Sequence, residues 1–192
     1  MRLERKRTSV LLGDGVSLRE LTREAERILD GLPALPDPFT PEAFAEVIAH
    51  RRGRPIIMRE LDPFGPDLPC GLWVSLADRD IVCYASEADP FLQDHIKMHE
   101  LAHILRGDER ELDAATLKRM LPSLSPALIA RLVEARRVLG RTGYGPNEEK
   151  GAEMLARVAA ERAREAARSD HFLRSLADAP PPRPRRFPWG RR

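Results

Sequence analysis

The sequence predicts a single α+β domain. In it, a small, mainly antiparallel three-stranded sheet packs on one histidine-bearing helix, with further helices on either side. Three observations support this fold class. The length of 192 residues suits one domain rather than two. Apolar residues recur at helical spacing in the first and last thirds of the chain. Three β-rich runs lie close together between them, as in a small sheet.

Two helices are predicted before the sheet. Ser17 begins the first, because Glu20 follows three positions later and the pair has capping-box spacing. An apolar stripe continues to a stop near Gly31. After a proline-rich connector, residues 40–41 (Thr-Pro) begin the second helix, since proline loses no hydrogen bond in a first turn. Gly53 ends it.

Three strands are predicted next, at residues 55–60, 70–76 and 80–84. The last two are separated by only three residues and should form an antiparallel hairpin. Strand 70–76 is expected to hold the backbone of an extended peptide by strand addition. Trp73 then lies either at the cleft or in the core.

Helical spacing returns at Phe91 and continues to Gly107, in the helix expected to carry the chemistry. Shorter helical segments are predicted at 112–121 and 125–139, and a long helix from Asn147 to about Ala167. The expected domain spans 17–176, between a flexible N-terminus (1–16) and a disordered tail (177–192) rich in proline and arginine.

Composition excludes several classes of protein. The net charge is only +2, and five arginines among the last ten residues leave −3 (+2 minus 5) on the remainder, so we expect no direct nucleic-acid binding. The arginine-rich tail itself either contacts phosphate or is simply solvated. No apolar run approaches the roughly 20 residues that cross a bilayer, so no membrane partner is expected. Two cysteines fit the reducing cytoplasm.

The residues His99-Glu100-Leu101-Ala102-His103 form a metal-binding pattern. Positions i and i+4 share one face of a helix, so both imidazoles can reach one zinc ion at about 2.0–2.1 Å. Glu100 would accept the proton of a metal-bound water and deliver it to the leaving amine, which is the chemistry of amide hydrolysis. The alternative is that these are ordinary helix residues.

Four acids are candidates for the third ligand: Glu149, Glu153, Asp108 and Glu109. Glu149 and Glu153 lie one turn apart on a predicted helix, so one can bind zinc while the other orients a ligand histidine. Glu109 has the spacing of the metzincin third ligand, but that pattern has glycine where this chain has Arg106.

Residues 95–108 resemble the active-site helix of ImmA/IrrE-type metallopeptidases, and residues 149–156 are similar to the second helix of that family. The resemblance implies a gluzincin-like site with Glu149 as third ligand, Glu153 supporting and Glu100 as base. Enzymes of this family are commonly encoded beside helix-turn-helix repressors, which they cleave. The implied partner is therefore a protein substrate such as a DNA-binding repressor.

The resemblance extends over roughly residues 40–165. The 45 residues between His103 and Glu149 predict a helical insertion between the ligands. Gly151 replaces a larger residue in the second helix and lowers its stability by about 1 kcal/mol relative to alanine.

Other residues are weaker candidates. Tyr144 could stabilise the oxyanion as a catalytic residue, and Arg141 could do so too, whereas the alternative for Tyr144 is a loop tyrosine packed on the surface. His95 lies one turn before His99 and is either a group near the substrate or a partly buried helix residue.

The sequence therefore predicts a zinc-dependent endopeptidase of the cytoplasm, which hydrolyses peptide bonds of an intracellular protein. One Zn²⁺ per chain is expected, although two imidazoles and a carboxylate discriminate poorly against Mn²⁺. The alternative function is a catalytically weak regulatory or toxin–antitoxin partner that acts by protein binding.

Overall fold

The structure is a computed structural model that describes residues 16–61, 71–108 and 145–177, with a few positions between 115 and 140. This part of the chain contains four helices and four strands, which confirms the α+β class. The helices are α1 (Leu18–Asp30), α2 (Pro41–Arg52), α3 (Pro90–Arg106) and α6 (Pro146–Ala177), and the strands are β1 (Ile56–Leu61), β2 (Gly71–Ser75), β3 (Asp80–Ala85) and β4 (Leu139–Gly140).

The first two helices begin and end as predicted. The Ser17 hydroxyl accepts the backbone N–H of Glu20 at 3.3 Å, and the Glu20 carboxylate accepts that of Ser17 at 2.8 Å. Thr40 caps α2 by accepting the backbone N–H of Ala43 at 3.1 Å. Gly53 ends α2 at a φ of 68°, where glycine avoids the strain that a Cβ atom would cause.

The sheet is small, as predicted, but its strands are mixed in direction. The strand order is β1-β3-β2-β4. β2 and β3 form the predicted antiparallel hairpin, whereas β1 runs parallel to β3, with Ile56 opposite Asp80. β4 adds two residues beside Val74 and Ser75, so Leu139 lies in a strand and not at the end of a helix.

A buried carboxylate explains why β1 pairs in parallel. Asp80, at the start of β3, is completely buried and accepts hydrogen bonds from Arg52 (2.9 Å), Arg54 (2.8 Å) and the indole of Trp73 (2.9 Å). Its backbone N–H also donates to the carbonyl of Pro55 at 2.9 Å. Both arginines lie within four residues before the start of β1, so their contacts with Asp80 bring the starts of β1 and β3 to the same end of the sheet. Trp73 is a core residue.

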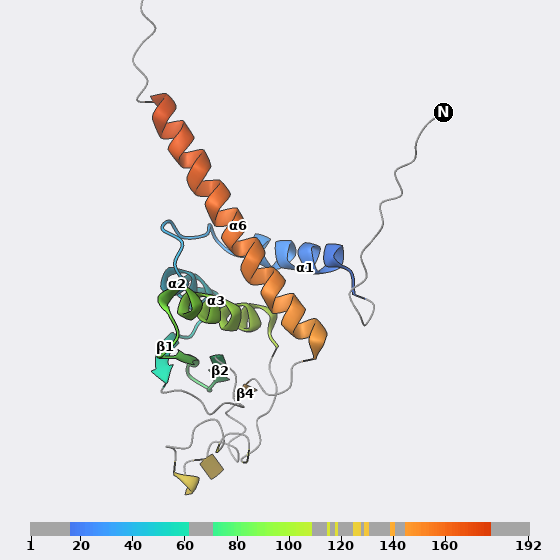
Figure 1. Cartoon of the computed structure of the whole chain (residues 1–192), viewed down its shortest axis with the longest axis vertical. Coiled ribbons are helices and arrows are strands. Elements are labelled where there is room, and N and C mark those ends of the chain that lie inside the picture. Colours follow the sequence, from blue (N-terminus) through green and yellow to red (C-terminus); the bar gives the residue numbers. More distant parts are fainter. Residues whose placement is uncertain are drawn as a thin grey trace, which may run out of the picture.

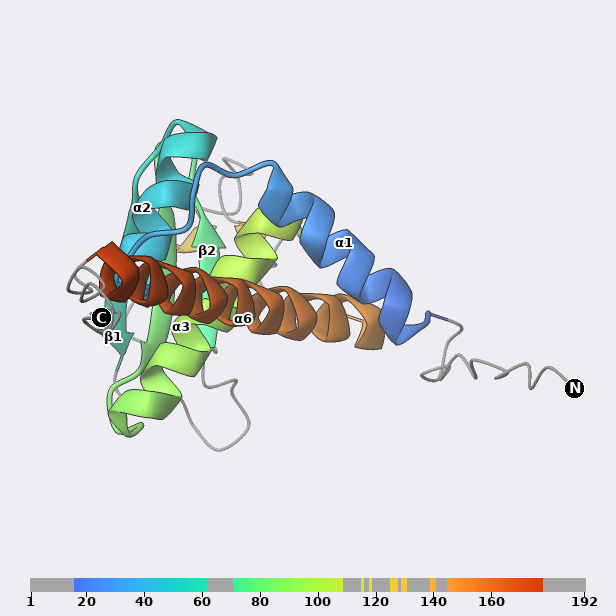
Figure 2. The same ribbon diagram turned by 90° about the horizontal axis from the view of Figure 1, so that it is seen from above.

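The helices pack against one another as well as against the sheet. α3 packs on β2 and β3, and α6 crosses α3 on the side away from the sheet (Figures 1 and 2). α1 packs along α6, and α2 contacts α3 and β1. α3 is therefore central, with the sheet on one side and α6 on the other. The core contains Phe44, Ile48, Trp73, Val82, Leu101, Ile104 and Leu155.

α6 extends ten residues beyond its predicted C-terminal end, because it ends at Ala177 and not near Ala167. Residues 164–171 are all exposed, so no buried apolar stripe runs through them for a pattern to detect. Alanine, arginine and glutamate, which are common in this stretch, have high helix propensity and favour continuation of the helix.

Several predictions fall on residues outside the described ranges: the flexible N-terminus, most of the two short helical segments, the tail, and the side chains of Glu109, Arg141 and Tyr144. Among the helices that are described, none is both long enough and apolar enough to cross a bilayer.

Candidate metal centre

The histidine helix is defined at both ends by its own sequence. Asp89 caps α3 by accepting a first-turn backbone N–H at 3.1 Å, and Pro90 follows in the first turn. Gly107 ends the helix at a φ of 72°. His99 and His103 therefore lie in its last two turns, one above the other.

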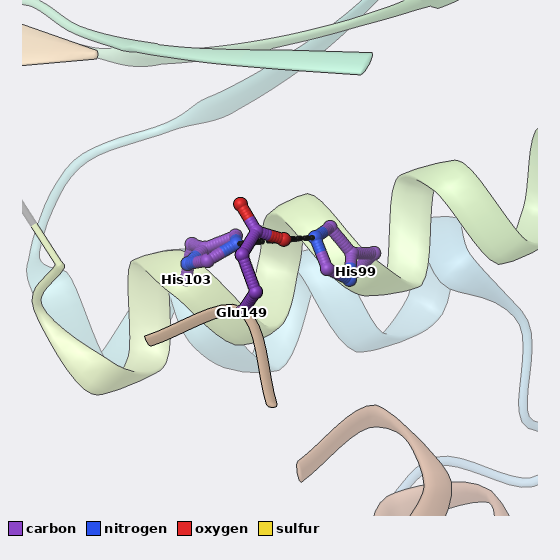
Figure 3. Close-up of side chains that lie close together, drawn as sticks. All are labelled: His99, His103 and Glu149. Atoms are coloured by element: carbon purple, nitrogen blue, oxygen red, sulfur yellow. Dashed lines mark hydrogen bonds and ion pairs between the residues drawn. The ribbon is translucent and has the colours of Figure 1, made fainter. Parts of the chain in front are cut away.

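The third residue comes from the start of α6. The Glu148 carboxylate accepts the backbone N–H of Gly145, which closes the first turn of that helix. Glu149 follows directly and points at the two histidines of α3 (Figure 3). The 45 intervening residues thus return the chain to the same site.

Three ligand atoms converge between α3 and α6. The Nε2 atoms of His99 and His103 lie 3.1 Å apart. Oε2 of Glu149 lies 3.2 Å from Nε2 of His99 and 4.0 Å from Nε2 of His103 (Figure 3). A tetrahedral ion with bonds of about 2.0–2.1 Å holds its ligand atoms about 3.3 Å apart. The residues present therefore fit one such ion, and His99, His103 and Glu149 form a group that could hold a metal.

Asp108 contacts one of these histidines and is not itself a member of the group. Its Oδ2 atom lies 2.9 Å from Nδ1 of His103, the ring nitrogen away from the ligand group. A proton on Nδ1 leaves the lone pair of Nε2 for a metal, which is the usual way in which a carboxylate fixes a ligand histidine. The His103 side chain is completely buried, so this contact decides how the ring is oriented.

Arg106 holds Asp108 in place. Its Nε donates to Asp108 at 2.9 Å and its Nη1 donates to Glu24 of α1 at 2.8 Å. The guanidinium crosses α6 at Gly151, where an added Cβ would lie 2.6 Å from Nη2 and closer still to Cζ and Nη1. Gly151 therefore serves a close approach between helices, a role that the sequence analysis missed.

Glu153 lies near Nδ1 of His99, the ring nitrogen that does not face Glu149. Its Oε2 lies 3.7 Å from Nδ1 of His99 and 3.6 Å from Nε2 of His95, which is within ion-pair range but too long for a hydrogen bond. Its predicted role as a supporting residue stays a prediction. His95 itself is 49% exposed rather than partly buried.

Glu100 lies in the contact between α3 and the sheet. Its side chain is completely buried, and a Cβ added to Gly71 at the start of β2 would lie 2.7 Å from its Oε1. Burial and the negative charge of Glu100 raise the pKa of the Cys83 thiol on β3 to about 12. Gly71 thus makes room for this carboxylate, whose catalytic role stays a prediction.

No protein-family model, curated protein or solved structure matches this chain. The likeness to ImmA/IrrE-type metallopeptidases therefore stays a prediction.

Proposed function

We propose that this protein is a zinc-dependent endopeptidase. The observation that carries the proposal is the convergence of His99, His103 and Glu149 from two helices, with ligand atoms 3.1 to 4.0 Å apart. Two imidazoles and a carboxylate are also the ligand set of hydrolytic zinc sites such as that of thermolysin.

Each residue at this group has a separate proposed role. His99, His103 and Glu149 would hold one Zn²⁺ ion, which when bound polarises a carbonyl and lowers the pKa of water. Asp108 keeps Nε2 of His103 directed at the ligand group. Glu100 is the residue that would accept the proton and pass it to the leaving amine, since it follows His99 directly on the same helix.

The proposed substrate is a protein of the cytoplasm. Two cysteines fit a reducing compartment, and the likeness of residues 95–108 to ImmA/IrrE-type enzymes suggests a helix-turn-helix repressor as the cleaved partner. This part of the proposal depends on the resemblance alone.

Replacement of Glu100 by glutamine tests the proposed activity. The variant keeps the size of the side chain but cannot act as a base, so zinc content should be unchanged while proteolysis is lost. New protein N-termini are compared by mass spectrometry between cells that produce the wild-type protein and cells that produce Glu100→Gln. Glu87→Gln is the matched control, because Glu87 is exposed in the turn before α3.

A small set of new N-termini should appear in cells with the wild-type protein and in cells with Glu87→Gln. The same N-termini should be absent from cells with Glu100→Gln. Identical sets in wild type and Glu100→Gln, with any cellular phenotype retained, would refute the enzyme and favour the regulatory partner that acts by binding.

A further inference from the structure

A cavity of about 460 Å³ opens directly beside the candidate metal centre. His99 and Glu149 form part of its wall, so it is continuous with the ligand group. Its size falls within the range of about 300–1,000 Å³ that is usual for ligand pockets. A molecule held at the metal centre would therefore place its neighbouring atoms in this cavity.

The side of the cavity formed by α1 is apolar. Leu18 and Leu21 from α1 line it together with Met154 from α6. Leu18 is 40% exposed although it is large and apolar, so covering it with an apolar ligand would be favourable. The capping box at Ser17 fixes the first turn of α1 and hence the place of Leu18.

The charged side of the cavity carries both signs, because Lys150 and Arg157 line it as well as two carboxylates. Arg157 lines the cavity, and its Nε is 3.0 Å from Oε1 of Glu161 on the next turn of α6. The two carboxylates in the wall are Glu149 and Glu153 at the metal centre. The polar groups of the wall therefore lie on the side of the metal centre, and the apolar groups lie on the side of α1, where a substrate side chain would fit.

We propose that this cavity receives the apolar side chain of the residue next to the scissile bond. The substrate class is then a peptide with a leucine-like or methionine-like side chain at that position. This inference rests on the proposed function, because the metal centre is what would hold the adjacent carbonyl.

Amino-acid hydroxamates test the cavity without requiring a known substrate. The hydroxamate group binds zinc, while the side chain reports on the cavity. Binding of glycine, leucine and aspartate hydroxamates to the zinc-loaded full-length protein is measured by calorimetry. Leucine hydroxamate should bind about tenfold or more tightly than the glycine compound, because its side chain is removed from water. Aspartate hydroxamate should show no such gain.

Two leucine variants locate the effect. Leu18→Ser should remove most of the leucine advantage and leave glycine hydroxamate binding unchanged. Leu92→Ser is the matched control, because Leu92 has the same exposed fraction of 40% but lies on α3 outside the residues that line this cavity. It should retain the full advantage.

The outcomes separate the inference from the proposed function. Equal binding of glycine and leucine hydroxamates would overturn the apolar cavity while leaving the metal centre intact. The same holds if Leu18→Ser and Leu92→Ser behave alike. Failure of every hydroxamate to bind the zinc-loaded protein would refute the proposed active site and the inference with it.

Discussion

Replacement of Gly151 by alanine should weaken zinc binding and also lower the free energy of unfolding. The added methyl group would occupy the space through which Arg106 passes, within 2.6 Å of its Nη2 atom. The guanidinium of Arg106 would have to shift, which would strain or break its contacts with Glu24 at 2.8 Å and Asp108 at 2.9 Å. Asp108 would then no longer be held against His103.

Two opposing effects set the change in stability. Alanine is more favourable than glycine in the interior of a helix by about 1 kcal/mol. Hydrogen bonds to charged groups each contribute roughly 1.5–3 kcal/mol, and the side chains of Arg106 and Asp108 are only 11% and 10% exposed. Loss of both contacts would outweigh the gain in helix propensity, so the free energy of unfolding should fall by about 2–5 kcal/mol, and by less where the flexible guanidinium keeps one of them.

Zinc binding should weaken as well. Loss of a carboxylate that orients a ligand histidine typically weakens metal binding about 10- to 100-fold. Zinc affinity is measured by competition with a chelator, and the free energy of unfolding of the metal-free protein by denaturant titration. Ala167→Gly, on an exposed face of the same helix, is the control that changes helix propensity alone. An increase in stability of the full 1 kcal/mol with zinc affinity unchanged would refute the role of Arg106.

Three further predictions follow from contacts elsewhere in the fold. Asp80→Ala should lower the free energy of unfolding by about 3 kcal/mol in denaturant titration, since it removes a buried carboxylate from the partly buried guanidinium groups of Arg52 and Arg54. Burial by itself raises the pKa of Glu42, but the hydrogen bond from Lys97 at 2.9 Å outweighs it and the pKa lies below its ordinary value. That pair therefore stabilises the fold above the unfolded-state pKa of Glu42, about 4.3, and the stabilisation is lost as the pH falls through the lower folded-state pKa. Glu42→Gln should accordingly lower the free energy of unfolding by up to about 1 kcal/mol at pH 7 and leave it unchanged at pH 2. Gly71→Ala should displace the Glu100 carboxylate and reduce turnover at least tenfold with zinc content unchanged, as measured by peptide cleavage and elemental analysis.

The helices could be predicted because their signals are local. Capping residues and glycines lie within a few positions of the ends they define, as at Ser17, Asp89 and Gly107. The pair of histidines was readable for the same reason, because i and i+4 always share a helix face.

The direction of β1 could not be read in this way. It depends on Asp80 binding two arginines more than 25 residues earlier in the chain. The roles of Asp108 and Gly151 were missed for a similar reason, because each depends on where Arg106 lies after α1, α3 and α6 have packed. Local sequence indicates only that Gly151 weakens a helix.

The central claim is that two helices form one zinc site, and elemental analysis of the purified full-length protein tests it most directly. About one zinc per chain is expected in the wild-type protein and in His95→Ala, and loss of zinc in His99→Ala/His103→Ala and in Glu149→Ala. Absence of zinc from the folded wild-type protein after metal has been offered, or its retention in the double histidine variant, would contradict the account.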